Sequence, residues 1–98
     1  MITQEYTYKN ITLAAPTTTL VVTGKGILHS IVINKPLALG SIIIYDAITA
    51  TNPIASIVKP ATLLSDVAQT VLYDVAFGVG LCIVTSGAAQ DITVCYQQ

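Results

Sequence analysis

The stretch Gly24–Asn34, GKGILHSIVIN, places a glycine turn directly before eight residues with an apolar period of two. Alternating β-branched residues that follow a glycine turn are typical of a half-buried β-strand. The alternation predicts one strand face with Ile27, His29, Ile31 and Ile33, and another with Leu28, Ser30, Val32 and Asn34. Gly24-Lys25-Gly26 lacks the length and the ending of a phosphate-binding loop, so we interpret it as a β-turn.

Strand-sized segments of the same kind recur along the chain between glycine and proline residues. We expect strands at 3–9, 11–14, 18–23, 27–35, 41–47, 54–59, 69–77, 80–85 and 91–97, with the first two as one strand if they are continuous. Residues 61–69 suit a short helix or a long loop equally well. Short strands with glycine and proline turns predict an all-β fold. The expected architecture is an antiparallel β-sandwich of jelly-roll type, with about eight short strands in a single domain over residues 1–98.

The composition indicates more apolar surface than one small core can bury. Hydrophobic residues make up 53% of the chain and charged residues only 9%, so few charges remain to solvate the exterior. The segments Ile31–Ile33 and Ile42–Ile44 carry large aliphatic side chains on both strand faces. We therefore predict a homo-oligomer. The candidate interface residues are Tyr6, Tyr8, Ile31, Ile33, Ile42 and Ile44.

Charge and hydropathy argue against two classes of partner. The chain has four lysines, no arginine and a net charge of −1, which is no footprint for nucleic acid. No apolar run approaches the roughly 20 residues of a membrane helix. The first ten residues, MITQEYTYKN, lack the basic and apolar regions of a signal peptide, which favours synthesis in the cytosol.

Candidate catalytic and metal-binding residues are few. His29 is the only histidine, and the adjacent Ser30 should point to the opposite strand face, so we interpret His29 as structural rather than as a metal ligand, base or pH switch. Asp46, Asp74 and Asp91 favour roles at turns and strand ends over calcium binding, because no Asp-rich loop is present. We accordingly expect no enzymatic activity and no cofactor.

The cysteines and tyrosines each allow two interpretations. Cys82 and Cys95 flank a predicted hairpin with its loop at 86–91, and facing positions would let them lie side by side inside the sandwich. Two buried thiols are favoured over a disulfide, since nothing else indicates an oxidising compartment. Sheet packing or interface anchoring is favoured over sugar stacking for the tyrosines that lie within predicted strands, Tyr6, Tyr45, Tyr73 and Tyr96.

The strand and turn segments together resemble small β-sandwich structural proteins of tailed bacteriophage virions. The resemblance rests on Gly24–Asn34, Gly40–Asp46 (GSIIIYD), Tyr73–Gly80 (YDVAFGVG), Leu81–Thr85 (LCIVT) and Asp91–Tyr96 (DITVCY). It implies a capsid decoration or cement protein, without enzymatic activity, that forms a homotrimer and binds the major capsid protein of the virion. A carbohydrate- or receptor-binding module of a phage fibre or tail is the alternative. Residues 1–10 would then be an extended N-terminal arm or an ordinary edge strand.

Overall fold

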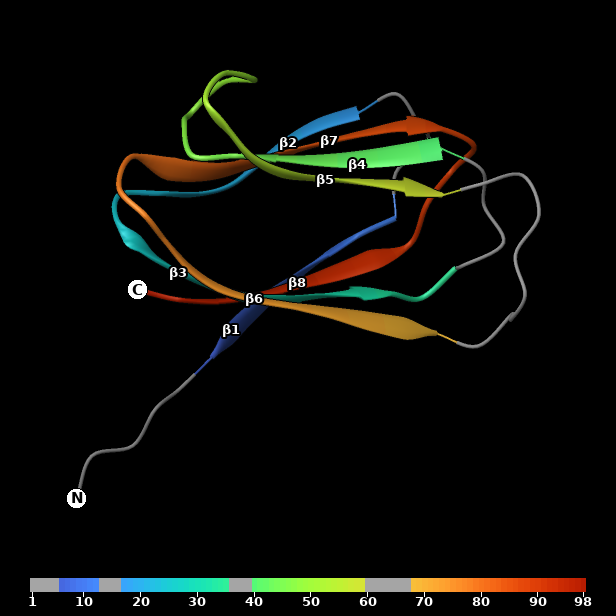
Figure 1. The fold of residues 1–98 in the computed structure, drawn as a ribbon, viewed down its shortest axis with the longest axis horizontal. Coiled ribbons are helices and arrows are strands. Elements are labelled where there is room, and N and C mark those ends of the chain that lie inside the picture. Colours follow the sequence, from blue (N-terminus) through green and yellow to red (C-terminus); the bar gives the residue numbers. More distant parts are fainter. Residues whose placement is uncertain (1–5, 13–16, 36–39, 60–67) are drawn as a thin grey trace.

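The computed structural model describes residues 6–12, 17–35, 40–59 and 68–98, and within these ranges the chain forms strands and loops without a helix (Figure 1). The strands are β1 (Thr7–Ile11), β2 (Thr17–Thr23), β3 (Gly26–Ile33), β4 (Gly40–Tyr45), β5 (Pro53–Lys59), β6 (Gln69–Phe77), β7 (Gly80–Gly87) and β8 (Ile92–Gln97). The all-β prediction is confirmed. The predicted helix or loop at 61–69 lies almost entirely outside the described residues.

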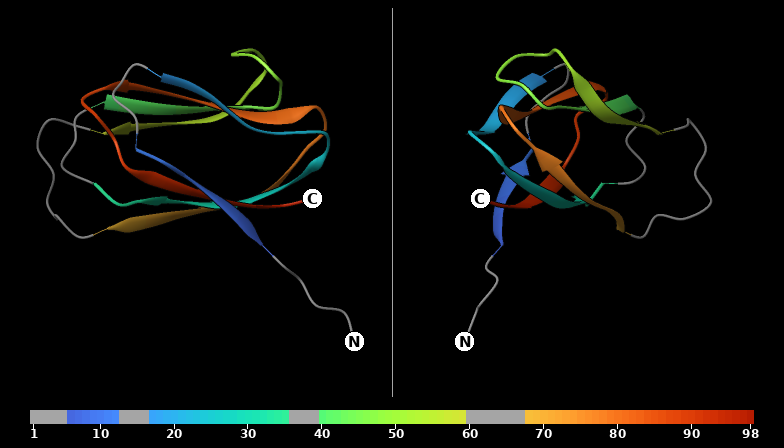
Figure 2. Two further views of the ribbon diagram at one scale, coloured as in Figure 1. Left: turned by 180° about the vertical axis from the view of Figure 1, so that it is seen from behind. Right: turned by 60° about the vertical axis from the view of Figure 1, so that its left-hand side comes forward.

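The strands form two antiparallel four-stranded sheets. Sheet A has the order β1-β8-β3-β6, and sheet B has the order β2-β7-β4-β5. Only β4 and β5 are consecutive strands within one sheet, while every other connection passes between sheets (Figures 1 and 2). This order is the jelly-roll arrangement of two interleaved Greek keys. The predicted jelly-roll sandwich is therefore the observed fold.

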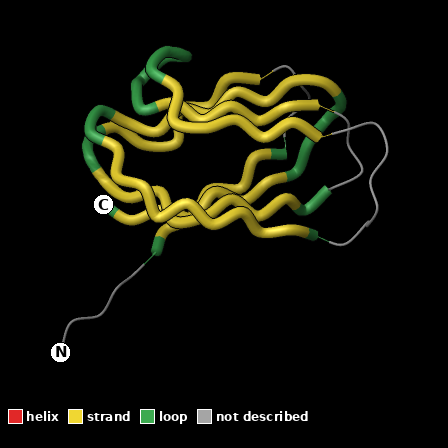
Figure 3. The backbone as a smooth tube through the Cα atoms, viewed as in Figure 1, coloured by secondary structure: helices red, strands yellow, loops and turns green. Residues whose placement is uncertain are grey.

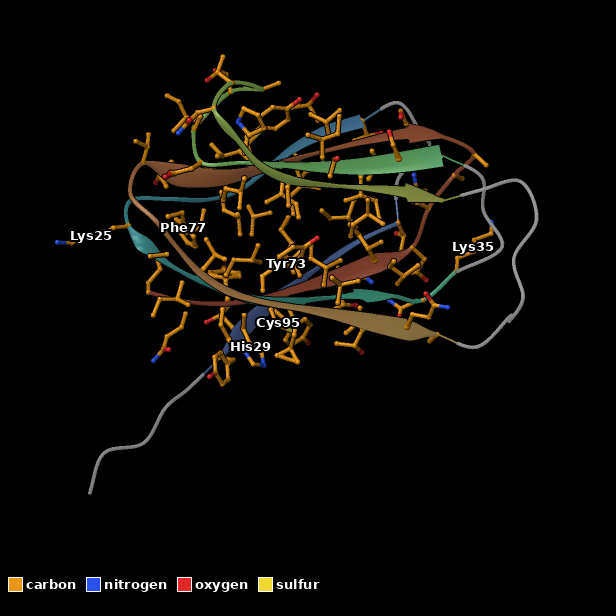
Figure 4. The ribbon with its side chains drawn as sticks, in the orientation of Figure 1. Lys25, His29, Lys35, Tyr73, Phe77 and Cys95 are labelled. Carbon is orange, nitrogen blue, oxygen red and sulfur yellow. The ribbon has the colours of Figure 1, made fainter. Side chains whose placement is uncertain are left out.

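The core lies between the two sheets and is made of aliphatic side chains that alternate along the strands. Along β6 and β8, the inward residues are those that the period of two predicts, and Figure 4 shows Tyr73 and Phe77 between the sheets. Burial raises the pKa of the Tyr73 phenol. The fully or nearly fully buried members of the core are Ile11, Leu28, Ile31, Ile33, Ile42, Ile44, Phe77, Leu81, Ile83, Ile92 and Val94.

A β-bulge at His29 interrupts the alternation of β3. The register of β3 with both of its neighbours shifts between Leu28 and Ser30. The extra residue changes the side of the sheet to which each later side chain of β3 points. Leu28 and Ile31 therefore both point into the core. The predicted common face of Ile27, His29, Ile31 and Ile33 is thus wrong for the residues before the bulge. Ile31 and Ile33 are buried, whereas Ile27 is 42% exposed.

Four of the predicted interface residues lie in the core of the protomer. Ile31, Ile42 and Ile44 have no exposed surface, and Ile33 is 3% exposed. They cover each other across the sandwich, so their side chains cannot contact another subunit. The structure corrects that expectation, whereas Tyr6 and Tyr8 are both exposed.

The predicted hairpin of Cys82 and Cys95 is also wrong. β7 pairs with β2 and β4 in sheet B, whereas β8 pairs with β1 and β3 in sheet A. The connection between them crosses the sandwich instead of forming a hairpin. Cys82 and Cys95 therefore lie in different sheets, and both are free thiols.

Candidate functional site

The outer side of sheet B, which we call face B, has no charged side chain on the described strands β2, β4 and β7. The outward residues of β2, β4 and β7 form it: an apolar centre of Leu20, Ile43, Tyr45, Cys82 and Val84, with the polar side chains of Thr18, Ser41 and Ser86 beside it. Leu20 is 43% exposed, and Ile43, Tyr45 and Val84 are half-buried. In the four strands of this sheet, Lys59 at the end of β5 is the one charged residue. Face B is therefore an uncharged surface with an apolar centre, and no other element of the described chain fully covers it.

Cys82 belongs to face B but is completely covered by its neighbours. It pairs with Leu20 on one side and with Tyr45 on the other, and its exposed fraction is zero. Burial raises the pKa of the Cys82 thiol, because a thiolate would lose its hydration there. Cys82 is thus a small apolar packing residue of face B.

A projecting loop at residues 46–52 borders face B. It connects β4 to β5 and stands above sheet B on the side away from sheet A (Figure 3). Ala47 is buried at its base, while Ile48 is 55% exposed. The ends of the loop are joined by Asp46 and Asn52: the Asp46 N–H donates to the Asn52 carbonyl over 3.0 Å, and Asn52 Nδ2 donates to the Asp46 carbonyl over 3.2 Å. The loop therefore presents Ile48 from a fixed base.

The Asp46 carboxylate also holds the turn between β6 and β7. It accepts hydrogen bonds from the N–H groups of Gly78 at 3.0 Å, Val79 at 2.8 Å and Gly80 at 3.4 Å. These hydrogen bonds, led by that from Gly78, lower the pKa of Asp46 below its usual value of 3.8. Because this turn passes from sheet A to sheet B, Asp46 fastens both sheets at this end. The predicted role of Asp46 at a strand end fits this geometry.

We expect Asp46→Asn to lower the unfolding midpoint at neutral pH. The pKa of Asp46 is lower in the folded state, so its stabilisation is present above pH 3.8 and is lost as the pH falls below that value. The wild-type and variant midpoints should therefore converge in acid. Thermal unfolding at about pH 7 and about pH 3 measures this convergence. An equal difference between the two proteins at both pH values would contradict it.

The outer side of sheet A, which we call face A, carries a row of three side chains near the β3 bulge. His29 Nδ1 and Asp74 Oδ1 are 2.7 Å apart, and the Tyr6 ring stacks on the imidazole with centroids 4.4 Å apart. Asp74 has a φ of +50°, which Asp tolerates better than most residues. The row links the start of β1, the bulge of β3 and the edge strand β6. Figure 4 shows His29 and Cys95 on this side of sheet A.

A second polar cluster lies at the other end of face A, where β1, β3 and β8 meet. Asn10 Nδ2 donates to Asp91 Oδ1 over 2.9 Å, to the Ile92 carbonyl over 3.0 Å and to Thr93 Oγ1 over 3.2 Å. Asn34 Nδ2 donates to the same Asp91 Oδ1 over 3.1 Å and to Thr93 Oγ1 over 3.0 Å. Two amides from different strands are thus held by one carboxylate and one hydroxyl.

An open pocket of about 600 Å³ lies at the end of the sandwich where β3 begins and β6 ends. Ile27, Ala76 and Phe77 supply apolar lining, and Gln97 and Gln98 line it with them. Lys25 is the one ionisable side chain among its lining residues, and Figure 4 shows it pointing away from the body of the protein. The pocket brings together no acid, base and nucleophile.

Within the described ranges, no group of three or more histidine, cysteine or acidic side chains lies close enough to hold a metal ion. In the same part of the chain, no helix has the length and hydropathy to cross a membrane.

Comparison of the chain with protein families, curated proteins and solved structures finds no match.

Sequence reasoning missed the residues that shape both faces. Neither Leu20, in a predicted strand without charge, nor Ile48, between two predicted strands, was singled out. Asn10 and Asn34 each lie at a strand end, where an amide is unremarkable by itself. Only the pairing of β1 and β3 with β8 brings these two amides to one place.

Proposed function

We propose that this chain is a non-enzymatic structural protein of a tailed-phage virion, which self-associates and decorates the capsid. The observation that carries the proposal is face B: an uncharged sheet surface with an apolar centre, with exposed Leu20 at its margin and Ile48 projecting beside it. Interface centres are depleted of charged residues in the same way. The resemblance to phage β-sandwich proteins supplies the kind of partner, the major capsid protein.

The two parts of face B suit different contacts. The strand surface around Ile43 and Val84 suits contact with a sheet of a second copy. Ile48 stands on a loop whose base is fixed by Asp46, so little conformational entropy is lost when it inserts into a partner. We assign the strand surface to self-association, as a homotrimer, and the loop to the capsid.

Decoration with several weak contacts stabilises a shell by mass action. A protein that binds only the assembled shell adds RT ln(1 + [L]/Kd) to the stability of each site. A trimer that contacts several capsid subunits multiplies the effect, because its second and third contacts are intramolecular. No reaction is needed for this function.

The test combines light scattering with co-sedimentation on capsids that lack this protein. The wild-type chain should be an oligomer that sediments with the shells, and Leu20→Asp should be a monomer that stays in the supernatant. Ile48→Asp should remain an oligomer but sediment poorly. The matched control is Leu72→Asp, which changes an equally apolar residue that is 63% exposed on the other sheet. A wild-type monomer at micromolar concentration that never sediments with shells would overturn the proposal.

A further inference from the structure

We infer that face A carries a binding site for a neutral saccharide, formed by Tyr8, Asn10, Asn34, Asp91 and Thr93. This site is separate from the surface proposed for self-association and capsid binding. The polar cluster leaves several hydrogen-bonding groups unused, and an aromatic ring lies beside them.

The orientation of both amides follows from their partners. A carboxylate and a backbone carbonyl only accept hydrogen bonds, so the nitrogen of each amide must face them. Asn10 Nδ2 meets Asp91 Oδ1 and the Ile92 carbonyl, and Asn34 Nδ2 meets Asp91 Oδ1. The amide donors are therefore engaged within the cluster, and the amide oxygens are left over.

The unused groups of the cluster are almost all acceptors. Among the described residues, no protein group donates to Oδ1 of Asn10, Oδ1 of Asn34 or Oδ2 of Asp91. The Thr93 hydroxyl accepts from both amides and keeps its own hydrogen to donate. Asn10 and Asn34 are exposed. A complementary ligand must present several hydrogen-bond donors at once.

Tyr8 supplies an apolar surface next to these acceptors. It is 72% exposed and lies two residues before Asn10 on β1, so the two side chains share face A about 7 Å apart. An aromatic ring in this position can stack on the C–H face of a sugar ring while the sugar hydroxyls donate to the cluster. A polyol with one apolar face matches both halves of the site.

A metal ion matches the site less well. Calcium requires six to eight oxygen ligands, whereas the cluster offers three free acceptor oxygens and a single carboxylate. Calcium would also make no use of Tyr8. We therefore assign the site to a saccharide.

The test is an NMR titration of the ¹⁵N-labelled full chain with glucose, galactose, mannose and N-acetylglucosamine, each to millimolar concentration. At least one sugar should shift the side-chain amide signals of Asn10 and Asn34 together and to saturation. Tyr8→Ala should weaken that binding about tenfold or more, while Tyr8→Phe should keep it. Leu72→Ala, an exposed change on the same sheet, should leave the affinity unchanged.

Three results would overturn the inference: no shift of the two amide signals with any of the sugars, an unchanged affinity in Tyr8→Ala, or saturable shifts of the same signals by calcium alone. Circular dichroism of each variant verifies that the fold is retained. The capsid-binding test uses residues of the other face, so either proposal can fail without the other.

Discussion

Ile44→Ala is expected to lower the free energy of unfolding by about 2–5 kcal/mol. Ile44 has no exposed surface and lies on the inner side of β4, opposite the inward residues of sheet A. Its truncation leaves a cavity that the paired strands on either side, β5 and β7, prevent from collapsing. Since small domains are stable by about 5–15 kcal/mol, the variant should be partly unfolded on moderate heating. Urea denaturation measures the loss.

The concentration dependence of unfolding separates a core role from an interface role. A core residue lowers stability equally at all protein concentrations, whereas an interface residue acts through the oligomer. The matched variant Leu20→Ala removes an aliphatic side chain that is 43% exposed, and we expect it to change the stability of the protomer by about 0.5 kcal/mol or less. A small effect of Ile44→Ala that depends on protein concentration would restore the interface role predicted from the sequence.

The sequence predicts the strands well because each one repeats the same local signal. Alternation alone identifies Val71, Tyr73 and Phe77 as the inner residues of β6, and the structure confirms this. Local alternation fails at His29, because β3 has one extra residue there relative to β8, and this bulge exchanges the two faces of the strand. Nothing in the pair His29-Ser30 distinguishes a bulge from a regular strand position.

The pairing of strands could not be predicted, because it depends on contacts between residues far apart in the chain. A glycine between two apolar segments, such as Gly87, fits a hairpin and a connection between sheets equally well. The prediction for Cys82 and Cys95 assumed a hairpin, whereas the jelly roll places β7 and β8 in opposite sheets.

The same limitation applies to the candidate sites. Ile42-Ile43-Ile44 indicated correctly that β4 is apolar on both faces, but the pattern cannot say which face lies inside. The structure assigns Ile42 and Ile44 to the core and Ile43 to face B. Part of the exposed apolar surface therefore lies on face B, at Leu20 and Ile43, while other exposed apolar residues such as Tyr8, Ile48 and Leu72 lie elsewhere.

Gly40→Ala is expected to cost more than about 3 kcal/mol of folding free energy. Gly40 begins β4 with a φ of +147°, which side chains with a Cβ rarely adopt. A Cβ at this position would lie 1.9 Å from the Ser86 carbonyl oxygen and 3.0 Å from Gln90 Nε2. Either β4 must separate from β7 or the buried Gln90 must leave its hydrogen bonds to the Ser41 and Ser86 carbonyls.

Variants at two further glycines separate the cost of the backbone conformation at Gly40 from the cost of the clash that an added Cβ makes. Gly24 has a φ of +91°, but a Cβ added there would lie 3.6 Å from its nearest neighbour, so Gly24→Ala should cost only the backbone strain of about 1–2 kcal/mol. Gly78 has no positive φ, and a Cβ added there would lie 3.9 Å from its nearest neighbour, Asp46 Oδ2, so Gly78→Ala should be nearly neutral. Urea denaturation of the three variants should rank Gly40→Ala as the least stable by a clear margin. Equal losses for Gly40→Ala and Gly24→Ala would mean that strands β4 and β7 separate readily at this end, and that the close approach of Gly40 to Ser86 does not stabilise the sheet that carries face B.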